Sequence, residues 1–219
     1  MRVPLFQNHI RSWYRKHGRH GLPWRQTRDP YRILVSEVML QQTQVSRVLR
    51  KYPEFLEAFP TMRALDRAPL DRVLRIWQGM GYNRRAVYLK RLAKIIVTDC
   101  GGRVPADPTL LTKLPGIGSG TAGAVAAFAF NRRTAFIETN IRRVYIHFFF
   151  GDRRRIRDTE ILKKIQATLP QRNTREWYYA LMDYGALALK GVENPNRRSA
   201  SYARQPKFSG SRRELRGKI

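Results

Sequence analysis

The stretch Leu114-Pro-Gly-Ile-Gly-Ser-Gly-Thr-Ala122 is a turn between two segments of helical spacing, 107–113 and 119–130. Gly116 and Gly118 permit positive φ angles and a close approach of the backbone to a ligand. Because the turn opens directly into the second helix, backbone N–H groups converge at a helix N-terminus, which favours anions. We expect a phosphate group here; an ordinary turn between packed helices is the alternative. The N–H groups belong to Gly116, Ile117, Gly118, Ser119, Gly120 and Thr121.

Helical spacing of apolar residues continues on both sides of this turn. Asp29-Pro30 marks one helix start, with Asp as the N-cap and Pro at the first helical position. The best strand candidate, 134–137, is too short to build a sheet. The sequence therefore predicts an all-α fold. The expected helices cover 4–17, 30–43, 45–58, 61–66, 69–77, 83–99, 107–113, 119–130, 140–149, 158–168 and 174–189.

The charge balance points to a polyanionic partner. Lys and Arg number 43 against 16 Asp and Glu, a net charge of +27. Such an excess destabilises a compact state by self-repulsion unless a polyanion relieves it, and nucleic acid is the commonest one. No segment reaches the ~18 apolar residues of a membrane-spanning helix, and no signal peptide opens the chain. We expect a cytoplasmic protein associated with the nucleoid and not with a membrane.

Cysteine usage excludes several kinds of site. Cys100 is the single cysteine, so neither a disulfide within the chain nor a multi-cysteine metal or iron–sulfur site is possible. The four histidines form no convincing ligand set. We therefore predict no metal site.

Glu37 is an acid among apolar residues. On a helix its neighbours are Ile33, Leu34, Leu40 and Gln41, so it points toward the buried side. Desolvation there raises a carboxyl pKa and makes Glu37 a candidate proton donor near neutral pH. A buried ion pair with one of the many arginines is the alternative.

Glu138 precedes a predicted helix, where the dipole and the free N–H groups hold an acid ionised. Simple helix capping is the alternative reading. One protonated and one charged carboxyl together suit cleavage of a glycosidic bond through an oxocarbenium-like transition state. In that reaction Glu37 protonates the leaving group, while Glu138 stabilises the sugar cation or prepares water.

Several motifs along the chain closely resemble those of the adenine DNA glycosylases of the MutY type, among the helix–hairpin–helix DNA glycosylases. The resemblance runs from about Trp13 to Val144 and resumes weakly at 180–186. The motifs are Leu22-Pro-Trp-Arg, Asp29-Pro-Tyr, Ser36-Glu-Val-Met-Leu-Gln-Gln-Thr-Gln-Val, Trp77-Gln-Gly-Met-Gly-Tyr-Asn-Arg-Arg-Ala and Leu114-Pro-Gly-Ile-Gly-Ser-Gly-Thr-Ala-Gly-Ala.

The resemblance implies a two-lobed helical fold with the active site in the cleft between the lobes and a base flipped out of the duplex into it. We expect one lobe over 22–133, including the helix–hairpin–helix motif at 107–130, and a second lobe from 1–21 plus 134–189. The basic segment 190–219 then stands where the family has its iron–sulfur loop. We expect this segment to dock on the globule through Tyr202 and Phe208, although a disordered tail is also compatible with its composition.

The resemblance also assigns roles. Glu37 matches the catalytic acid, Glu138 the second carboxylate and Asn140 its supporting amide. The residues that match walls of the base pocket are Trp24, Arg25, Leu40, Val45 and Asp183. Those that match the wedge inserted into the duplex are Gln41, Gln42 and Tyr82.

The chain departs from the family pattern at four places. The family has Asp at position 138, and related bifunctional lyases carry Lys where this chain has Gly120, so we expect a monofunctional enzyme without a Schiff-base step. The cluster cysteines are missing, and the chain ends before the domain that reads 8-oxoguanine. We expect no required cofactor, with a monovalent cation at the hairpin as the one ion to consider.

Three functions remain open at this point. The first is a monomeric, monofunctional glycosylase of base excision repair that acts on double-stranded DNA with a mispaired or damaged base, adenine opposite 8-oxoguanine or guanine foremost. The second is a glycosylase for thymine or uracil opposite guanine, or for hypoxanthine. The third is a non-catalytic DNA-binding module, which the Glu at position 138 favours and the intact Glu37 motif opposes.

Overall fold

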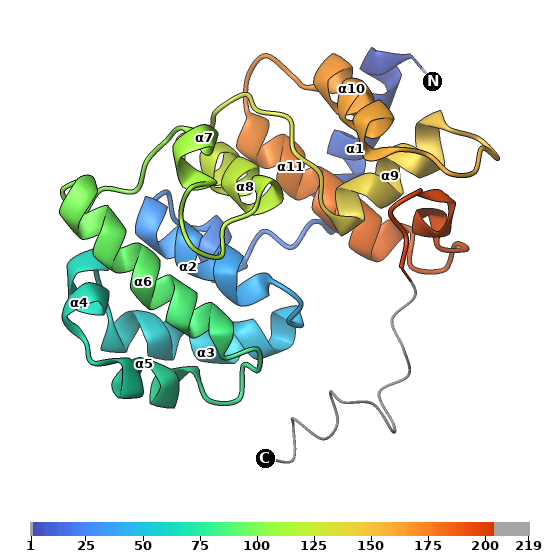
Figure 1. Cartoon of the computed structure of the whole chain (residues 1–219). Helices are drawn as coiled ribbons and strands as arrows, with labels where there is room; N and C mark the ends of the chain where they lie inside the picture. Colours follow the sequence, from blue (N-terminus) through green and yellow to red (C-terminus); the bar gives the residue numbers. More distant parts are fainter. Residues whose placement is uncertain (1, 204–219) are drawn as a thin grey trace.

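The computed structural model describes residues 2–203 and is helical (Figure 1). Within these residues the only β-type pairing is an isolated bridge between Ile156 and Ser199, so the all-α prediction is confirmed. The helices are α1 Val3–His17, η1 Pro23–Arg25, α2 Pro30–Leu40, α3 Val45–Ala58, α4 Met62–Arg67, α5 Leu70–Trp77, α6 Arg84–Asp99, α7 Pro108–Leu111, α8 Ser119–Phe130, α9 Thr139–Phe149, α10 Asp158–Thr168, α11 Thr174–Asp183, the π-helical turn η2 Tyr184–Ala188 and η3 Pro195–Arg198.

Three helices end earlier than their sequence periodicity predicts. Helix α2 begins as expected, with the Asp29 side chain accepting from the N–H groups of Tyr31 and Arg32, but it ends at Leu40 and not near residue 43. Helix α7 spans four residues of the predicted 107–113. The predicted helix 174–189 is α-helical to Asp183 and then widens into η2. The residues that follow α2 and α7 are polar, whereas the apolar residues that follow α11 continue into η2.

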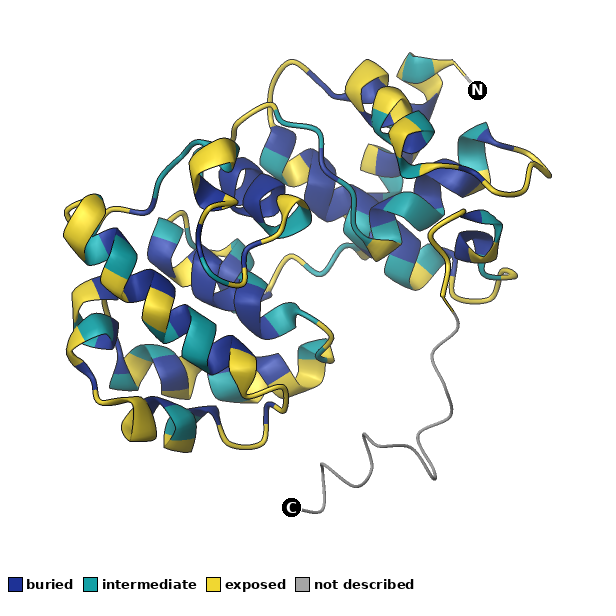
Figure 2. Ribbon diagram, in the orientation of Figure 1, coloured by how far each residue is buried: buried dark blue, intermediate teal, exposed yellow. Residues whose placement is uncertain are grey.

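The core consists of two hydrophobic clusters. The first is built from residues between Leu22 and Val125, and the second from α1, Ile33 and residues between Ala124 and Leu189. Helix α8 contributes to both, and it contacts α2 on one side and α11 on the other. Its Ala-rich sequence is apolar on every face, and it is buried over most of its length (Figure 2). The lobe boundary predicted after residue 133 therefore follows a helix that serves both clusters.

The segment after η2 docks on the second cluster as far as the structure describes it. Asn196 is buried and donates from Nδ2 to the Thr139 carbonyl at 3.1 Å, and Ser199 pairs with Ile156. Tyr202 is 39% exposed, so the prediction that this ring anchors the segment is wrong; small and polar side chains do so. Phe208 lies outside the described residues. No helix in 2–203 is long and apolar enough to cross a bilayer.

Candidate active site

Glu37 lies on α2 with a half-buried side chain. Its carboxylate has no hydrogen bond or ion pair with any described residue, which excludes the predicted alternative of a buried Arg–Glu pair for this part of the chain. Burial, and to a smaller extent the negative charge of Glu138, raise the pKa of Glu37 from 4.5 to about 8 against the opposing charge of Arg25. Glu37 is therefore mostly protonated at neutral pH and can donate that proton.

Glu138 is the N-cap of α9. Its Oε1 accepts from the N–H groups of Asn140 and Ile141, both at 2.8 Å, and its Oε2 accepts from the Asn140 side chain at 3.3 Å. Burial raises the pKa of Glu138 above its ordinary value, and these hydrogen bonds and the charge of Arg142 offset only part of that rise. The predicted capping interaction is therefore present. It holds Oε1 firmly, while Oε2 accepts only the longer hydrogen bond from the Asn140 side chain.

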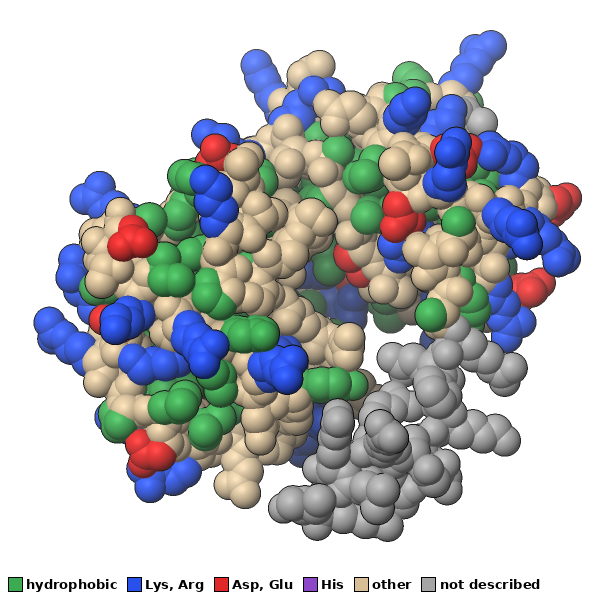
Figure 3. Space-filling model, viewed as in Figure 1, with side chains coloured by type: hydrophobic (Ala, Val, Ile, Leu, Met, Phe, Trp, Pro, Cys, Tyr) green, Lys and Arg blue, Asp and Glu red, His purple; other side chains and the backbone are tan. Residues whose placement is uncertain are grey.

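Both carboxyls lie beside the N-terminal half of α8. Gln41, one turn after Glu37, donates to Thr121 Oγ1 at 3.2 Å in the first turn of α8. On the other side, the Ile137 carbonyl is 3.1 Å from where a Cβ of Gly120 would stand, and Glu138 follows directly. The surface is hollowed between the two lobes, with acidic atoms (red) at the rim of the hollow (Figure 3). A base that leaves its sugar there would meet the Glu37 acid, and the sugar, as it develops positive charge, would meet the Glu138 carboxylate.

Arg25 and Asp183 form a buried charged cluster behind this pair. Asp183 is fully buried and accepts from both the backbone and the guanidinium of Arg19 and from both terminal nitrogens of Arg25. The Arg25 side chain is 5% exposed and lies over the Tyr179 ring, 4.5 Å from its centroid. These contacts and its ion pairs keep the pKa of Asp183 low despite burial. Asp183 thus fixes Arg25, whose charge acts on Glu37.

The remaining predicted pocket residues differ in how accessible they are. Trp24 is buried and packs edge-on against Tyr52, while Leu40 and Val45 are half-buried and pack against the first cluster. The role of all five residues as walls of a base pocket stays a prediction. A recess of about 810 Å³ lies at the opposite, C-terminal end of α8; it is lined by Arg25 and Tyr179 but by neither Glu37 nor Glu138.

The three predicted wedge residues lie on two neighbouring turns. Gln42 and Tyr82 have positive φ angles of 53° and 49°, and the Tyr82 side chain is half exposed. Gln41 points to the hairpin instead, with Nε2 3.3 Å from the Gly116 carbonyl. Whether these residues enter a duplex stays a prediction.

The hairpin differs from its prediction in two details. Gly116 has φ +77°, and a Cβ there would lie 2.9 Å from Tyr88, but Gly118 has an ordinary φ of −84° and open space around it. The Ile117 N–H donates to the Leu114 carbonyl, so this amide is engaged in the turn and not available to an anion. No side chain caps α8, which leaves the N–H groups of Ser119, Gly120 and Thr121 without an acceptor among residues 2–203.

The residues present do not fit an iron–sulfur cluster. Cys100, the single cysteine, lies at the C-terminal end of α6 and packs against the first cluster. Residues 190–203 pack against α9 through Asn196 without a thiol among them.

Three residues around the site were not predicted. Arg19 holds Asp183 across 164 positions of sequence, which no local pattern indicates. Gly185 touches the N-terminus of α9, where an added Cβ would lie 2.4 Å from the Asn140 carbonyl. Arg85 sits beneath the two wedge turns; its place in the Asn83-Arg-Arg-Ala motif was the available signal.

A family model for HhH-GPD superfamily base excision DNA repair proteins matches residues 35–171. Among curated relatives, the adenine DNA glycosylase of Buchnera aphidicola subsp. Baizongia pistaciae is 37% identical over 188 residues, which are 85% of this chain and 54% of that one. That of Mycobacterium tuberculosis H37Rv is 41% identical over 83% of this chain and 61% of its own. That of Mycolicibacterium smegmatis is 36% identical over 95% and 76%, respectively. The chain thus spans little more than half the length of the Buchnera relative.

Two solved structures share the fold. A thermostable thymine-DNA glycosylase superposes with a TM-score of 0.77 at 28% identity, over 84% of this chain and 86% of that one. Endonuclease III in a non-covalent DNA complex superposes with a TM-score of 0.73 at 20% identity, over 87% of each chain. The second likeness concerns the fold alone.

Proposed function

The chain belongs to the HhH-GPD superfamily of base excision DNA repair proteins, and we propose that it is a monofunctional DNA glycosylase that removes adenine mispaired with guanine or 8-oxoguanine. The observation that carries this proposal is the pair Glu37 and Glu138: a desolvated acid without an ionic partner among residues 2–203 lies in the field of a hydrogen-bonded carboxylate. The relatives named as adenine DNA glycosylases support the choice of base.

In the proposed reaction Glu37 gives its proton to the departing base, which leaves as a neutral molecule. The C1′–N bond breaks as the sugar develops positive charge, and Glu138 stabilises that charge. Asn140 keeps the Glu138 carboxylate in place through its side-chain and backbone N–H groups. Water then adds to C1′ and gives up a proton to the Glu37 carboxylate left by the first step, which leaves an abasic site and restores the acid. Gly120 offers no amine for a covalent sugar adduct, so the strand is left intact.

We further propose that the chain acts as a monomer on double-stranded DNA, in the cytoplasm at the nucleoid. The net charge of +27 and the uncapped start of α8 support phosphate contacts at the hairpin. A monovalent cation at the hairpin belongs to the same proposal; the Gly116 carbonyl there already accepts from Gln41. The reaction as written needs no cofactor.

A second specificity has support of its own. The thymine-DNA glycosylase that superposes at 28% identity makes thymine opposite guanine the leading alternative substrate. A purely DNA-binding role is less well supported, because a binder has no use for the isolated, desolvated Glu37.

The test is a panel of labelled duplexes, each with one suspect pair, followed by alkali to break abasic sites. The panel holds adenine opposite guanine and 8-oxoguanine, thymine and uracil opposite guanine, and hypoxanthine opposite thymine. Cleavage confined to the adenine strands is expected. Cleavage at thymine or uracil would show that this base, and not adenine, is the substrate. Binding without any cleavage would favour the non-catalytic role.

A further inference from the structure

Arg85, in the first turn of α6, is the most heavily hydrogen-bonded buried cation in the described chain. Its exposed fraction is 8%, and it has no acidic partner among residues 2–203. Its Nη1 donates to three carbonyls at the end of α2: Val38 at 3.0 Å, Met39 at 2.8 Å and Gln41 at 2.6 Å. These are the carbonyls that a helix end leaves without intrahelical donors. Arg85 therefore ends α2 at Leu40 and fixes the turn that follows.

The other terminal nitrogen of Arg85 binds a second turn. Nη2 donates to Thr43 Oγ1 at 2.9 Å in the first turn, and to the carbonyls of Met80 at 3.3 Å and Gly81 at 3.1 Å. One guanidinium thus ties together two turns separated by some forty residues of sequence, 41–43 and 80–82. The planar group, with its five donors in fixed directions, suits this task, whereas a lysine ammonium has three donors around one point.

Each turn presents a non-glycine residue in the left-handed region. Gln42 has φ 53° and Tyr82 has φ 49°, conformations that cost about 1 kcal/mol or more for such residues. Tyr82 is also 50% exposed, and its ring centroid is 5.5 Å from the Arg85 Cζ atom, while the Trp77 ring lies 5.3 Å from the same atom. An exposed aromatic ring held rigidly on a strongly basic protein is suited to insertion between stacked bases.

We propose that Arg85 is a positioning residue that locks the turns 41–43 and 80–82 into one rigid wedge, which presents Gln42 and Tyr82 to the base stack while the target base leaves it. The inference rests on the proposed function, because it assigns Arg85 to the duplex-opening step of that reaction. A wedge fixed in advance loses little conformational freedom on binding, so more of the contact energy is left for unstacking.

The test compares Arg85→Lys with Arg84→Lys, a neighbouring exposed arginine whose replacement keeps the charge. Single-turnover excision is measured on two duplexes. In one the adenine is mispaired with guanine and stacked in the helix; in the other the adenine is a single-base bulge and is already unstacked. Arg85→Lys is expected to slow excision from the pair at least tenfold and from the bulge less than threefold, whereas Arg84→Lys changes neither. Equal losses on both substrates would overturn the proposal, because a general loss of structure affects both alike.

A second readout keeps this inference separate from the chemistry. The fluorescence of 2-aminopurine at the target position rises when the duplex opens, whether or not a base is cut. The wild type is expected to raise it and Arg85→Lys to lose most of the rise. If the wild type raises the fluorescence without excising adenine, the proposed function is wrong, but the inference that the wedge opens the duplex still stands. If Arg85→Lys raises it as much as the wild type does, the wedge inference fails.

Two further variants guard against misfolding. Thr43→Val removes one acceptor of the Arg85 guanidinium without touching the core, and it is expected to show the same selective loss on the paired substrate, to a smaller extent. Combining Arg85→Lys with Tyr82→Ala should slow the paired substrate no more than the stronger single change does. Full additivity would show that Arg85 does not act through Tyr82.

Discussion

Glu37 and Glu138 differ in what surrounds each carboxyl. No described residue donates to Glu37, whereas Glu138 accepts from two backbone N–H groups and one amide. A proton is therefore easier to keep on Glu37, and a charge is easier to keep on Glu138. Arg25 is the cation that could reverse this order, but Asp183 takes both of its terminal nitrogens. The division of roles therefore depends on how Arg25 is engaged.

The pH dependence of excision tests this division. With the pKa of Glu37 raised to about 8, the single-turnover rate constant is expected to fall about tenfold per pH unit above that value, because the acid has lost its proton. At lower pH the rate falls again where Glu138, whose pKa is raised by burial, takes up a proton. A rate that stays constant up to about pH 9.5 would contradict the role of Glu37 as the acid.

Stability offers an independent measurement of the same carboxyl. Because the pKa of Glu37 is higher in the folded chain than its ordinary 4.5, the folded state holds this proton where the unfolded state has released it. The free energy of unfolding contributed by Glu37 should thus decrease as pH rises from 4.5 to about 8, by at most about 1.4 kcal/mol per unit. Denaturant unfolding of Glu37→Gln should lack this decline, and parallel curves for the two proteins would exclude the shift.

Gly120 gives a prediction of a different kind. Borohydride reduction during the reaction is expected to trap no protein–DNA adduct, because no amine stands at that position to form a Schiff base with the sugar. The measurement is a denaturing gel, on which only a covalent protein–DNA complex migrates more slowly than the free DNA. A glycosylase that uses a catalytic lysine is the positive control. A trapped band would show that another amine attacks the sugar.

At this scale, local sequence spacing predicts the direction in which Glu37 points and the cap formed by Glu138. It does not predict that Glu37 lacks a partner, because that depends on the contact of Arg25 with Asp183, 158 positions away. The Arg85 contacts are equally non-local, with acceptors on α2 and on the turn before α6.

At the scale of single elements, the N-terminus of α9 depends on the close approach of η2. A Cβ on Gly185 would lie 2.4 Å from the Asn140 carbonyl and 2.9 Å from its Cβ. Asn140 in turn supports the Glu138 carboxylate. Glycine is needed at 185 for this contact, and the π-helical widening of η2 begins directly before it.

Gly185→Ala is therefore expected to lower excision by roughly 10- to 100-fold by displacing Glu138, since displacements on this scale misalign reacting groups. DNA affinity should change little, because the three atoms nearest the added methyl group all belong to Asn140 and none to the hairpin. Gly191→Ala is the matched control, with nothing within 4 Å of the added Cβ. Single-turnover rates measure excision, and filter binding measures DNA affinity. Equal effects of Gly185→Ala and Gly191→Ala on excision would contradict the role of Gly185 in placing Glu138.

Apolar spacing was enough to predict α3 over Val45–Ala58 and α8 over Ser119–Phe130, although no side chain caps either helix. It did not predict the ends of α2 and α11. In α2 the Arg85 guanidinium replaces the next turn of helix as the partner of the last carbonyls. Residue spacing alone contains no information on such a partner.

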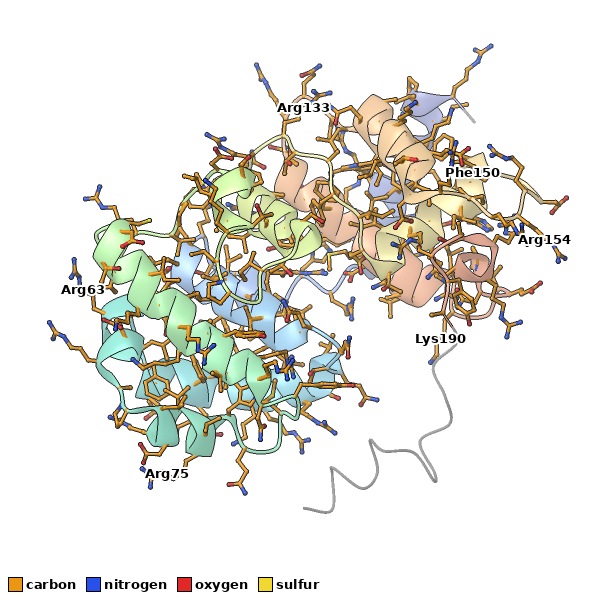
Figure 4. The ribbon with its side chains drawn as sticks, in the orientation of Figure 1. Arg63, Arg75, Arg133, Phe150, Arg154 and Lys190 are labelled. Atoms are coloured by element: carbon orange, nitrogen blue, oxygen red, sulfur yellow. The ribbon has the colours of Figure 1, made fainter. Side chains whose placement is uncertain are left out.

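At the scale of the whole molecule, Lys and Arg side chains are scattered over both lobes on the face shown in Figure 3. Arg75, Arg154 and Lys190, from widely separated parts of the chain, project away from the body (Figure 4). The net charge of +27 therefore acts as a broad field and not as a single patch. Composition predicted the sign of this field, but its distribution over the surface required the fold.

DNA affinity should fall steeply with salt. Neutralising about six phosphates would lower the association constant roughly 10³-fold between about 50 and 200 mM monovalent salt. Fluorescence anisotropy of a labelled duplex without a mismatch measures this slope. A flat dependence would show that the charge excess does not act on the DNA backbone.

The most direct test of the central claim is release of free adenine from an adenine–guanine duplex by the wild type and by Glu37→Gln, followed by chromatography under single-turnover conditions. The wild type is expected to release adenine, and the glutamine variant to release it at least about 100-fold more slowly while binding the duplex within a few-fold of wild type. Release by Glu37→Gln at an undiminished rate would contradict the assignment of Glu37 as the catalytic acid.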